Sequence, residues 1–236
     1  MSAPRANGLG TPRHHRRRCD STNDLGRELA ASGAPHGTVV TADEQSAGRG
    51  RQGRSWIAPA GKALLYSAIV RPLDERHLLL PLAAALAVAD AAEATAPVRC
   101  EVKWPNDVWI EGRKCAGVLI EARPQDGWAV IGVGLNVSIE AEEFPAELRE
   151  TATSLGGGAT VDSALEELNA ALDRWATAEP AAVLESFRAR DALRGREVSW
   201  DGGSGTADGV DERGNLVVRV PGGEVLALGA GEIHLG

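Results

Sequence analysis

Residues 103–121 read KWPNDVWIEGRKCAGVLIE. Two apolar, β-prone runs flank the central Glu-Gly-Arg turn, a pattern that predicts a β-hairpin. A proline interrupts the first run, so Asn106 and Asp107 are expected at a sharp bend, and Lys114 begins the second strand. A carboxylate for a metal or a hydroxyl, beside a lysine for a phosphate, favours a nucleotide site. For Lys114 or Asp107 alone, an exposed strand end or an ordinary turn residue explains the pattern equally well.

Upstream of this hairpin, residues 43–56 read DEQSAGRGRQGRSW. Glycine lets a backbone bend tightly and approach a ligand. Arginine adds a permanent cation whose planar donors fit carboxylate and phosphate oxygens. We expect this Gly-Arg loop to enclose a small anion and to be mobile until the anion arrives. A solvated loop with arginines for solubility is the alternative. The spacing is not that of a phosphate-binding P-loop, and no apolar helix follows as a dinucleotide fingerprint requires.

Taken together, these motifs resemble the biotin protein ligases. The matching segments follow the family's order: Ser21-Thr22-Asn23, Gly48–Trp56, Lys103–Asp107, Lys114–Glu121 and Gly132–Val137. The resemblance covers roughly residues 19–236. It implies an α+β fold, with a mixed-sheet catalytic domain of the biotin/lipoate ligase type over residues 19–190. A small C-terminal SH3-like β-barrel is expected over residues 191–236.

The resemblance also implies an activity in two steps. Biotin and ATP react to give biotinyl-5′-AMP, and the biotin then passes to a lysine of a biotin carboxyl carrier domain of a carboxylase. The implied enzyme is a biotin–[biotin carboxyl-carrier protein] ligase. A lipoate or octanoate ligase or transferase of the same fold is the alternative. A nucleic-acid binder that uses its arginines is a second rival.

The same resemblance assigns site residues. Lys114 and Arg51 are the expected catalytic residues, with Lys114 at the carboxylate and α-phosphate. The expected biotin-binding residues are Ser21, Thr22, Asn23, Gln45, Gly48, Arg49, Arg51, Lys114 and Gly117. The expected nucleotide-binding residues are Arg51, Arg54, Trp56, Asn106, Asp107 and Asn136. Mg²⁺ is expected with ATP, and Asp107 is the candidate metal ligand.

Composition narrows the class of protein. The 236 residues include 25 Lys plus Arg against 33 Asp plus Glu, a net charge of -8, which disfavours a protein that coats nucleic acid. Cys19, Cys100 and Cys115 show no metal spacing, so we expect reduced thiols in the cytoplasm. The longest apolar stretch, residues 78–89, is too short to span a membrane. A homodimer is compatible with the sequence, which leaves the oligomeric state open.

The N-terminus is expected to be a disordered basic leader over residues 1–18. It is rich in Gly, Pro, Ser and Ala up to Pro12, and Arg13–Arg18 is strongly basic. The run lacks the apolar stretch of a secretion signal. It is also too short for an N-terminal DNA-binding domain. We therefore expect the monofunctional type of ligase, without specific binding to DNA.

The remaining segments follow periodicity and turn signals. Helices are expected over residues 22–31, 75–94, 163–176 and 181–193, the third opened by a capping box of Ser163 and Glu166. Strands are expected over residues 38–43, 64–71, 101–104, 108–110, 114–122 and 128–136. Short β runs between glycines follow residue 195.

Overall fold

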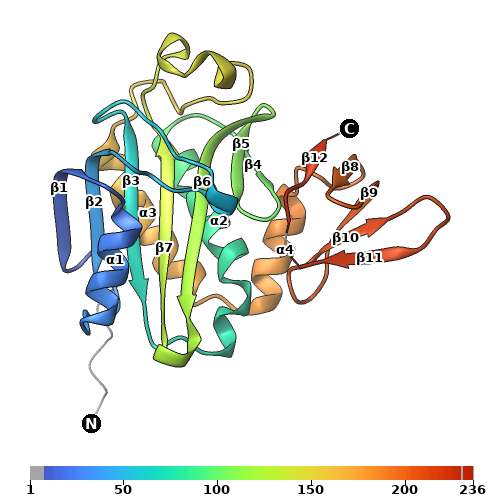
Figure 1. Cartoon of the computed structure of the whole chain (residues 1–236), viewed down its shortest axis with the longest axis horizontal. Helices are drawn as coiled ribbons and strands as arrows, with labels where there is room; N and C mark the ends of the chain where they lie inside the picture. The colour runs from blue at the N-terminus through green and yellow to red at the C-terminus, as the bar shows by residue number, and fades with distance from the viewer. Residues whose placement is uncertain (1–7, 230, 236) are drawn as a thin grey trace.

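The computed structural model describes residues 8–229 and 231–235, and Figure 1 shows its two β-sheets side by side. The larger sheet has seven strands in the order β1-β2-β3-β7-β6-β5-β4. Only the β1–β2 pair is parallel. The strands are β1 (Arg13–Cys19), β2 (Val39–Gln45), β3 (Ala63–Val70), β4 (Cys100–Lys103), β5 (Asp107–Ile110), β6 (Arg113–Arg123) and β7 (Trp128–Asn136).

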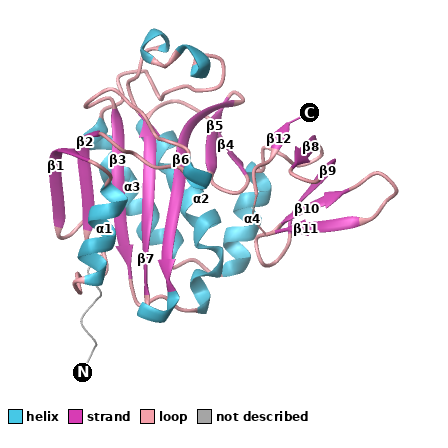
Figure 2. Ribbon diagram, viewed as in Figure 1, coloured by secondary structure: helices cyan, strands magenta, loops and turns pink. Residues whose placement is uncertain are grey.

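Helices cover both faces of the larger sheet. α1 (Thr22–Ala31) lies in front of the sheet, whereas α2 (Leu80–Thr95) and α3 (Val161–Ala176) lie behind it (Figures 1 and 2). α4 (Pro180–Arg190) joins α2 on the rear side, near the smaller sheet. Because β3 lies between the two layers, all eight of its residues are buried, as its near-continuous apolar sequence predicts.

α2 is the central helix of the rear layer. Together with the turn before it, the segment His77–Thr95 is long and apolar enough to cross a membrane by length and composition alone. However, 67% of its apolar window is buried inside the protein, and a core helix passes the same test. α2 packs against α3, α4 and the rear of the sheet. Its alanines allow close approach, so this helix belongs to the main hydrophobic core.

The C-terminal residues form a five-stranded antiparallel sheet in the order β11-β10-β9-β8-β12. Its strands are β8 (Glu197–Trp200), β9 (Gly203–Val210), β10 (Leu216–Arg219), β11 (Val225–Leu228) and β12 (His234–Leu235). Leu216 and Val218 belong to the main hydrophobic core, and the Trp104 Nε1 donates to the Gly214 carbonyl oxygen at 2.8 Å. The α+β class with a small C-terminal β unit is therefore confirmed. The division at residue 190 stays a prediction.

The expectation of a disordered leader over residues 1–18 is wrong for its described part. Arg13–Cys19 forms the edge strand β1. Upstream, Leu9 is 7% exposed in the main core, and its amide donates to the Asp173 Oδ1 at 2.7 Å. A polar edge strand shows no alternation of apolar residues, since β2 supplies its hydrogen bonds and solvent meets its side chains. Residues 1–7 lie outside the described residues.

Three expected helices begin or end elsewhere. The capping box of α3 pairs Thr160 with Ser163, so the helix begins at Val161 instead of Ser163. The segment predicted over residues 75–94 begins with a 3-10 turn, Glu75–Leu79, before α2. α4 ends at Arg190, short of the predicted residue 193. The expected helix 22–31 is confirmed at both ends.

Candidate active site

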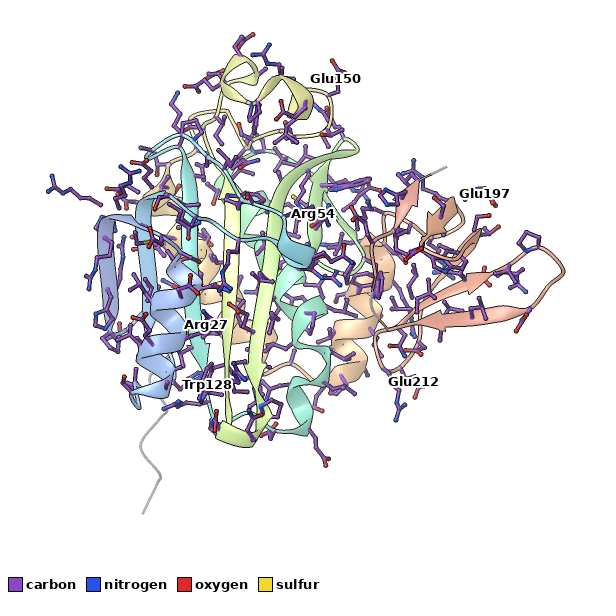
Figure 3. The ribbon with its side chains drawn as sticks, viewed as in Figure 1. Arg27, Arg54, Trp128, Glu150, Glu197 and Glu212 are labelled. Atoms are coloured by element: carbon purple, nitrogen blue, oxygen red, sulfur yellow. The ribbon has the colours of Figure 1, made fainter. Side chains whose placement is uncertain are left out.

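A cavity of about 510 Å³ lies beneath the Gly-Arg loop, on the α1 face of the larger sheet. Its floor comes from β6 and β7, and its walls come from the start of α1, the bend before β5 and β12 of the smaller sheet. Figure 3 shows Arg54 on the loop that crosses the sheet and Arg27 on α1. The cavity has the size of an ordinary small-molecule site. Every predicted site residue except Gly48 lines it.

The lining of this cavity is strongly cationic although the whole chain is acidic. Among the described residues that line it, Asp107 is the only carboxylate. Its permanent cations are Arg49, Arg51, Arg54, Lys103 and Lys114. Such a concentration of one sign of charge in a cleft focuses the field and attracts anions. The cavity is therefore suited to a ligand that carries carboxylate or phosphate groups.

Lys114 is held between a carboxylate and an aromatic ring. Its Nζ lies 2.7 Å from the Asp107 Oδ1 and 5.7 Å from the centroid of the Trp56 ring. The backbone around it is also fixed, because its amide donates to the Thr151 carbonyl oxygen at 2.8 Å and its own carbonyl accepts from the Thr153 amide. Lys114 thus presents its ammonium group to the cavity from a rigid strand.

The floor of the cavity depends on glycines. A Cβ at Gly134 would lie 2.3 Å from the Trp56 Cε2, and one at Gly117 would lie 3.2 Å from the Lys114 Nζ. Trp56 can therefore pack against β7 only because Gly134 lacks a side chain, and a side chain at Gly117 would crowd Trp56 and Lys114. Gly117 was expected at the biotin site, and the structure places it directly beneath Trp56 and Lys114. The requirement for Gly134 is visible only once the pairing of β6 with β7 is known.

A row of buried polar side chains lines one end of the cavity. Ser21, Thr22 and Asn23 are at most 4% exposed. The Thr22 amide donates to the Gln45 Oε1 at 2.7 Å. Ser21 is the N-cap residue of α1, but its side chain makes no capping hydrogen bond, and the residue lines the cavity. Hydrogen bonds within the protein hold Thr22 and Asn23 in place, so a polar group of a ligand would meet a preorganised polar surface.

Three arginines of the Gly-Arg loop make polar contacts with the rest of the protein. The Arg49 Nη2 lies 2.9 Å from the Asp24 Oδ1, and the Arg51 Nη1 donates to the Asn106 Oδ1 at 3.1 Å. The Arg54 Nη1 lies 2.6 Å from a carboxylate oxygen of Glu232, in the C-terminal unit. The loop therefore bridges α1, the bend before β5 and the C-terminal unit. Its expected mobility before ligand binding stays a prediction.

Two of the cations that line the cavity, Arg51 and Lys103, have shifted pKa values. Burial lowers the pKa of the Arg51 guanidinium and of the Lys103 ammonium from their ordinary values. Asp107 opposes this shift in both groups. An arriving anion therefore gains from cations that are already partly desolvated, since such charges interact more strongly than solvated ones. Lys103 lies 5.0 Å from the centroid of the Trp109 ring.

Asn136 lines the cavity but is already engaged. Its Nδ2 donates to the Thr153 carbonyl oxygen at 2.9 Å, so it braces the segment beside Lys114. Sequence reasoning missed Ser67, which is fully buried under the polar row, and His234, which reaches the cavity from β12. No local pattern marks either residue. Only long-range strand order brings them to the site.

Cys115 is a buried packing residue, as its strand pattern predicts. It is 0% exposed, and its Sγ lies 3.4 Å from the Val108 carbonyl oxygen. A hydrogen bond with the Cys100 thiol, together with burial, raises the pKa of the Cys115 thiol well above its ordinary value. A thiol in this state is a poor nucleophile.

The cation-lined cavity on a mixed sheet defines a small-molecule-binding domain. Comparisons with known proteins place the chain in a family. The model of the biotin/lipoate A/B protein ligase family matches residues 16–138, more than half of the chain. The biotin–[acetyl-CoA-carboxylase] ligase of Mycobacterium tuberculosis is 39% identical over 91% of this chain and 86% of its own length. This chain belongs to the biotin/lipoate A/B protein ligase family.

Other relatives are longer or more distant. The bifunctional ligase/repressor BirA of Bacillus spizizenii is 40% identical over 61% of this chain, and the match spans 46% of its own length. The chain thus aligns with about half of that relative. The biotin protein ligase from Aquifex aeolicus, in complex with biotin and ATP, superposes with a TM-score of 0.79. It is 27% identical, and the match covers 96% of this chain and 99% of that one.

Proposed function

We propose that this protein activates biotin with ATP to give biotinyl-5′-AMP and then transfers biotin to a lysine of a carrier protein. The observation that carries the proposal is the cavity itself. Arg51, Lys103 and Lys114 interact with the lining carboxylate Asp107, whereas the buried polar side chains of Ser21, Thr22 and Asn23 line another part of it. A ligand with a neutral polar ring and an acid tail fits this division, and biotin has both.

The family includes lipoate ligases, so the buried polar row must discriminate between the two acids. The ureido ring of biotin offers two donors and an acceptor to Ser21, Thr22 and Gln45. The dithiolane ring of lipoate offers none of comparable strength. A site built to hydrogen-bond a ligand rejects an analogue that leaves its polar groups unpaired. The names of the Mycobacterium tuberculosis and Aquifex aeolicus relatives agree with this preference.

The first chemical step joins two anions. The biotin carboxylate attacks the α-phosphorus of ATP, a P–O bond forms, and pyrophosphate leaves with its electron pair. Lys114 and Arg51 offset the repulsion and stabilise charge that develops on the phosphate oxygens. Arg54 holds the departing phosphates, and Trp56 covers the nucleotide side. Closure of the Gly-Arg loop keeps water from the mixed anhydride. No covalent enzyme intermediate is required.

Mg²⁺ fits the site as an ion held mainly by the nucleotide. No group of three or more His, Cys, Asp or Glu side chains that suits a metal occurs among the described residues. Asp107 is the lining carboxylate that such an ion would meet, and it is bound to Lys114 here. Mg²⁺ commonly takes one or two carboxylates plus substrate phosphates. Its contribution is to neutralise phosphate charge.

The second step requires a lysine from a partner. The amine attacks the carbonyl carbon of biotinyl-5′-AMP, an amide bond forms and AMP leaves. We propose a biotin carboxyl carrier domain of a carboxylase as this partner, in the cytoplasm. Specific DNA binding is not part of the proposal.

Isothermal titration tests the ligand preference directly. Biotin and lipoate are titrated separately into the protein, with and without a non-hydrolysable ATP analogue and Mg²⁺. We expect biotin to bind about a hundredfold more tightly, because leaving a buried polar group unpaired costs about 1–3 kcal/mol. Equal affinities, or a preference for lipoate, would reject biotin as the substrate.

A further inference from the structure

Four charged side chains from three elements meet beside the cavity. Asp24 and Arg27 come from α1, Arg49 comes from the Gly-Arg loop, and Glu121 comes from β6. The Arg49 Nη2 lies 2.9 Å from the Asp24 Oδ1 and 2.8 Å from the Glu121 Oε2. Arg27 contacts the same two carboxylates from the other side. Glu121 has the least exposed side chain of the four, at 23%.

Glu121 does more than pair with arginines. Its Oε2 also accepts a hydrogen bond from the Asn23 Nδ2 at 2.9 Å. Asn23 is only 3% exposed, and the Leu119 carbonyl oxygen is a second acceptor for its amide, at 3.3 Å. Because both acceptors lie near the Asn23 Nδ2, the two ends of the side-chain amide cannot exchange places. The amide nitrogen faces β6, and the oxygen faces β3.

The fixed amide oxygen continues the chain of hydrogen bonds. The Ser67 Oγ donates to the Asn23 Oδ1 at 2.6 Å and lies 2.9 Å from the Thr22 Oγ1. The Thr22 Oγ1 lies 3.0 Å from the Gln45 Oε1. Because a hydroxyl has one proton, the orientation of each group limits that of the next. Because the Ser67 proton goes to Asn23, the Thr22 hydroxyl must donate to Ser67 to continue the network, and the Thr22 amide makes the link to the Gln45 Oε1 at 2.7 Å. In this arrangement hydrogen bonds connect Glu121 to Gln45 beneath the cavity.

Asn23 packs closely against β7. A Cβ at Gly132 would lie 2.1 Å from the Asn23 Oδ1 and 2.8 Å from its Nδ2. The side chain therefore lies against the bare backbone of β7. If it lost its acceptor on Glu121, its buried amide would be left with a single long hydrogen bond, which is costly. Exposed ion pairs, by contrast, contribute little.

We infer that Glu121 is a positioning residue for the biotin end of the cavity. It orients Asn23. Through Asn23 and Ser67 it also fixes the orientation of the buried polar side chains that meet the ligand. It also anchors Arg49 and so the first residues of the Gly-Arg loop. Glu121 contacts no ligand itself. The inference rests on the proposed function for the identity of the ligand, but the anchoring of the loop is a property of the free protein.

Two substitutions separate the two tasks. Glu121→Ala removes both the acceptor for Asn23 and the anchor for Arg49. Glu121→Gln retains an acceptor for Asn23 but loses the charge that holds Arg49. Glu93→Gln is the matched control: this carboxylate accepts from the Cys100 amide at 2.8 Å and pairs with Arg190 at 3.0 Å, away from the cavity.

For Glu121→Ala we expect biotin affinity by titration to fall about tenfold to a hundredfold, the cost of a lost hydrogen bond to a charged group. The KM for biotin should rise by a similar factor at nearly unchanged kcat. Glu121→Gln should recover the affinity to within about threefold. Amide hydrogen exchange over residues 48–56 of the free protein should be faster in both variants. Glu93→Gln should match the wild type in every measurement.

Wild-type affinity and KM in Glu121→Ala, with unchanged loop exchange, would overturn the inference. If Glu121→Ala lowered kcat and stability together without changing KM, Glu121 would be an ordinary structural residue. That result would also overturn the inference. If Glu121→Ala does not fold, unchanged loop exchange in Glu121→Gln overturns the anchoring. A wild-type protein that binds no biotin rejects the proposed function instead, and the exchange measurement still decides the anchoring of Arg49.

Discussion

The ammonium group of Lys114 lies 2.7 Å from the carboxylate of Asp107, and both side chains face the same cavity. The pair joins the start of β5 to the start of β6 across the hairpin. Asp107 holds the lysine in place before a ligand arrives. An arriving carboxylate or phosphate then competes with Asp107 for a cation that needs no further reorganisation. Preorganised charge of this kind is the usual source of electrostatic stabilisation in active sites.

Lys114→Ala removes that cation. We expect the rate of biotin-dependent pyrophosphate release to fall about a hundredfold to a thousandfold, the range for losing one preorganised charge. The melting temperature should change little, because the side chain is about one third exposed. Lys62→Ala is the control, since Lys62 also pairs with a carboxylate, Glu143, but does not line the cavity. Near-normal pyrophosphate release by Lys114→Ala would reject its role.

Arg51→Ala breaks the link between the loop and the bend before β5, where Arg51 donates to Asn106. We expect weaker biotin binding and faster escape of biotinyl-5′-AMP, because the loop no longer covers the anhydride. Filtration of protein loaded with labelled biotin and ATP measures the escaped fraction. Arg17→Ala, on the exposed edge strand, provides the comparison. Equal retention of the adenylate by Arg51→Ala and wild type would contradict the assignment.

The burial of Leu9 predicts that the segment before β1 contributes to stability. Leu9→Ala should lower the free energy of unfolding by about 2–5 kcal/mol, the range for removing a buried leucine side chain. Leu78→Ala should change it by less than about 0.5 kcal/mol, because Leu78 is 64% exposed. Urea denaturation followed by circular dichroism measures both. Similar small effects for the two leucines would show that residues 8–12 do not pack as described.

Asp191 is expected to make stability depend on pH. Burial raises the pKa of its carboxyl, backbone amides oppose the shift, and its Oδ2 is buried without a partner. A raised folded-state pKa adds stability below the unfolded value, and this contribution is lost as pH rises through the folded value. Asp191→Asn should therefore be more stable than wild type at pH 7. The advantage should shrink below roughly pH 4. Denaturant midpoints between pH 3 and pH 7 measure this, and a less stable variant at pH 7 would contradict it.

Much of the fold is readable from the sequence where local patterns are strong. Glu111-Gly112 marks the hairpin, and the apolar run of β3 marks a buried strand. Two features of the N-terminus are not readable in this way. β1 is polar along its whole length, and Leu9 stands in a Gly/Pro-rich stretch. Both are ordered by partners distant in sequence, β2 and α3, so no local window reveals them.

The residues of the candidate site also differ in how far the sequence reveals them. Motif residues such as Lys114 and Arg51 are identifiable because their types and spacing carry chemistry. Ser67 lies in no such motif, and Glu121 ends one without an assigned role, since each acts through contacts that the strand order creates. Gly132 begins another matching segment, but only the structure shows that it makes room for Asn23. Supporting residues of an active site are thus the part that sequence patterns predict least.

Mass spectrometry of a mixture of the protein, biotin and Mg-ATP tests the central proposal most directly. We expect biotinyl-5′-AMP and an equal amount of pyrophosphate, with no adenylate when lipoate replaces biotin. Addition of a carrier domain should then increase its mass by one biotinyl group at a single lysine, with release of AMP. Absence of biotinyl-5′-AMP, or formation of lipoyl-AMP in its place, would contradict the proposal.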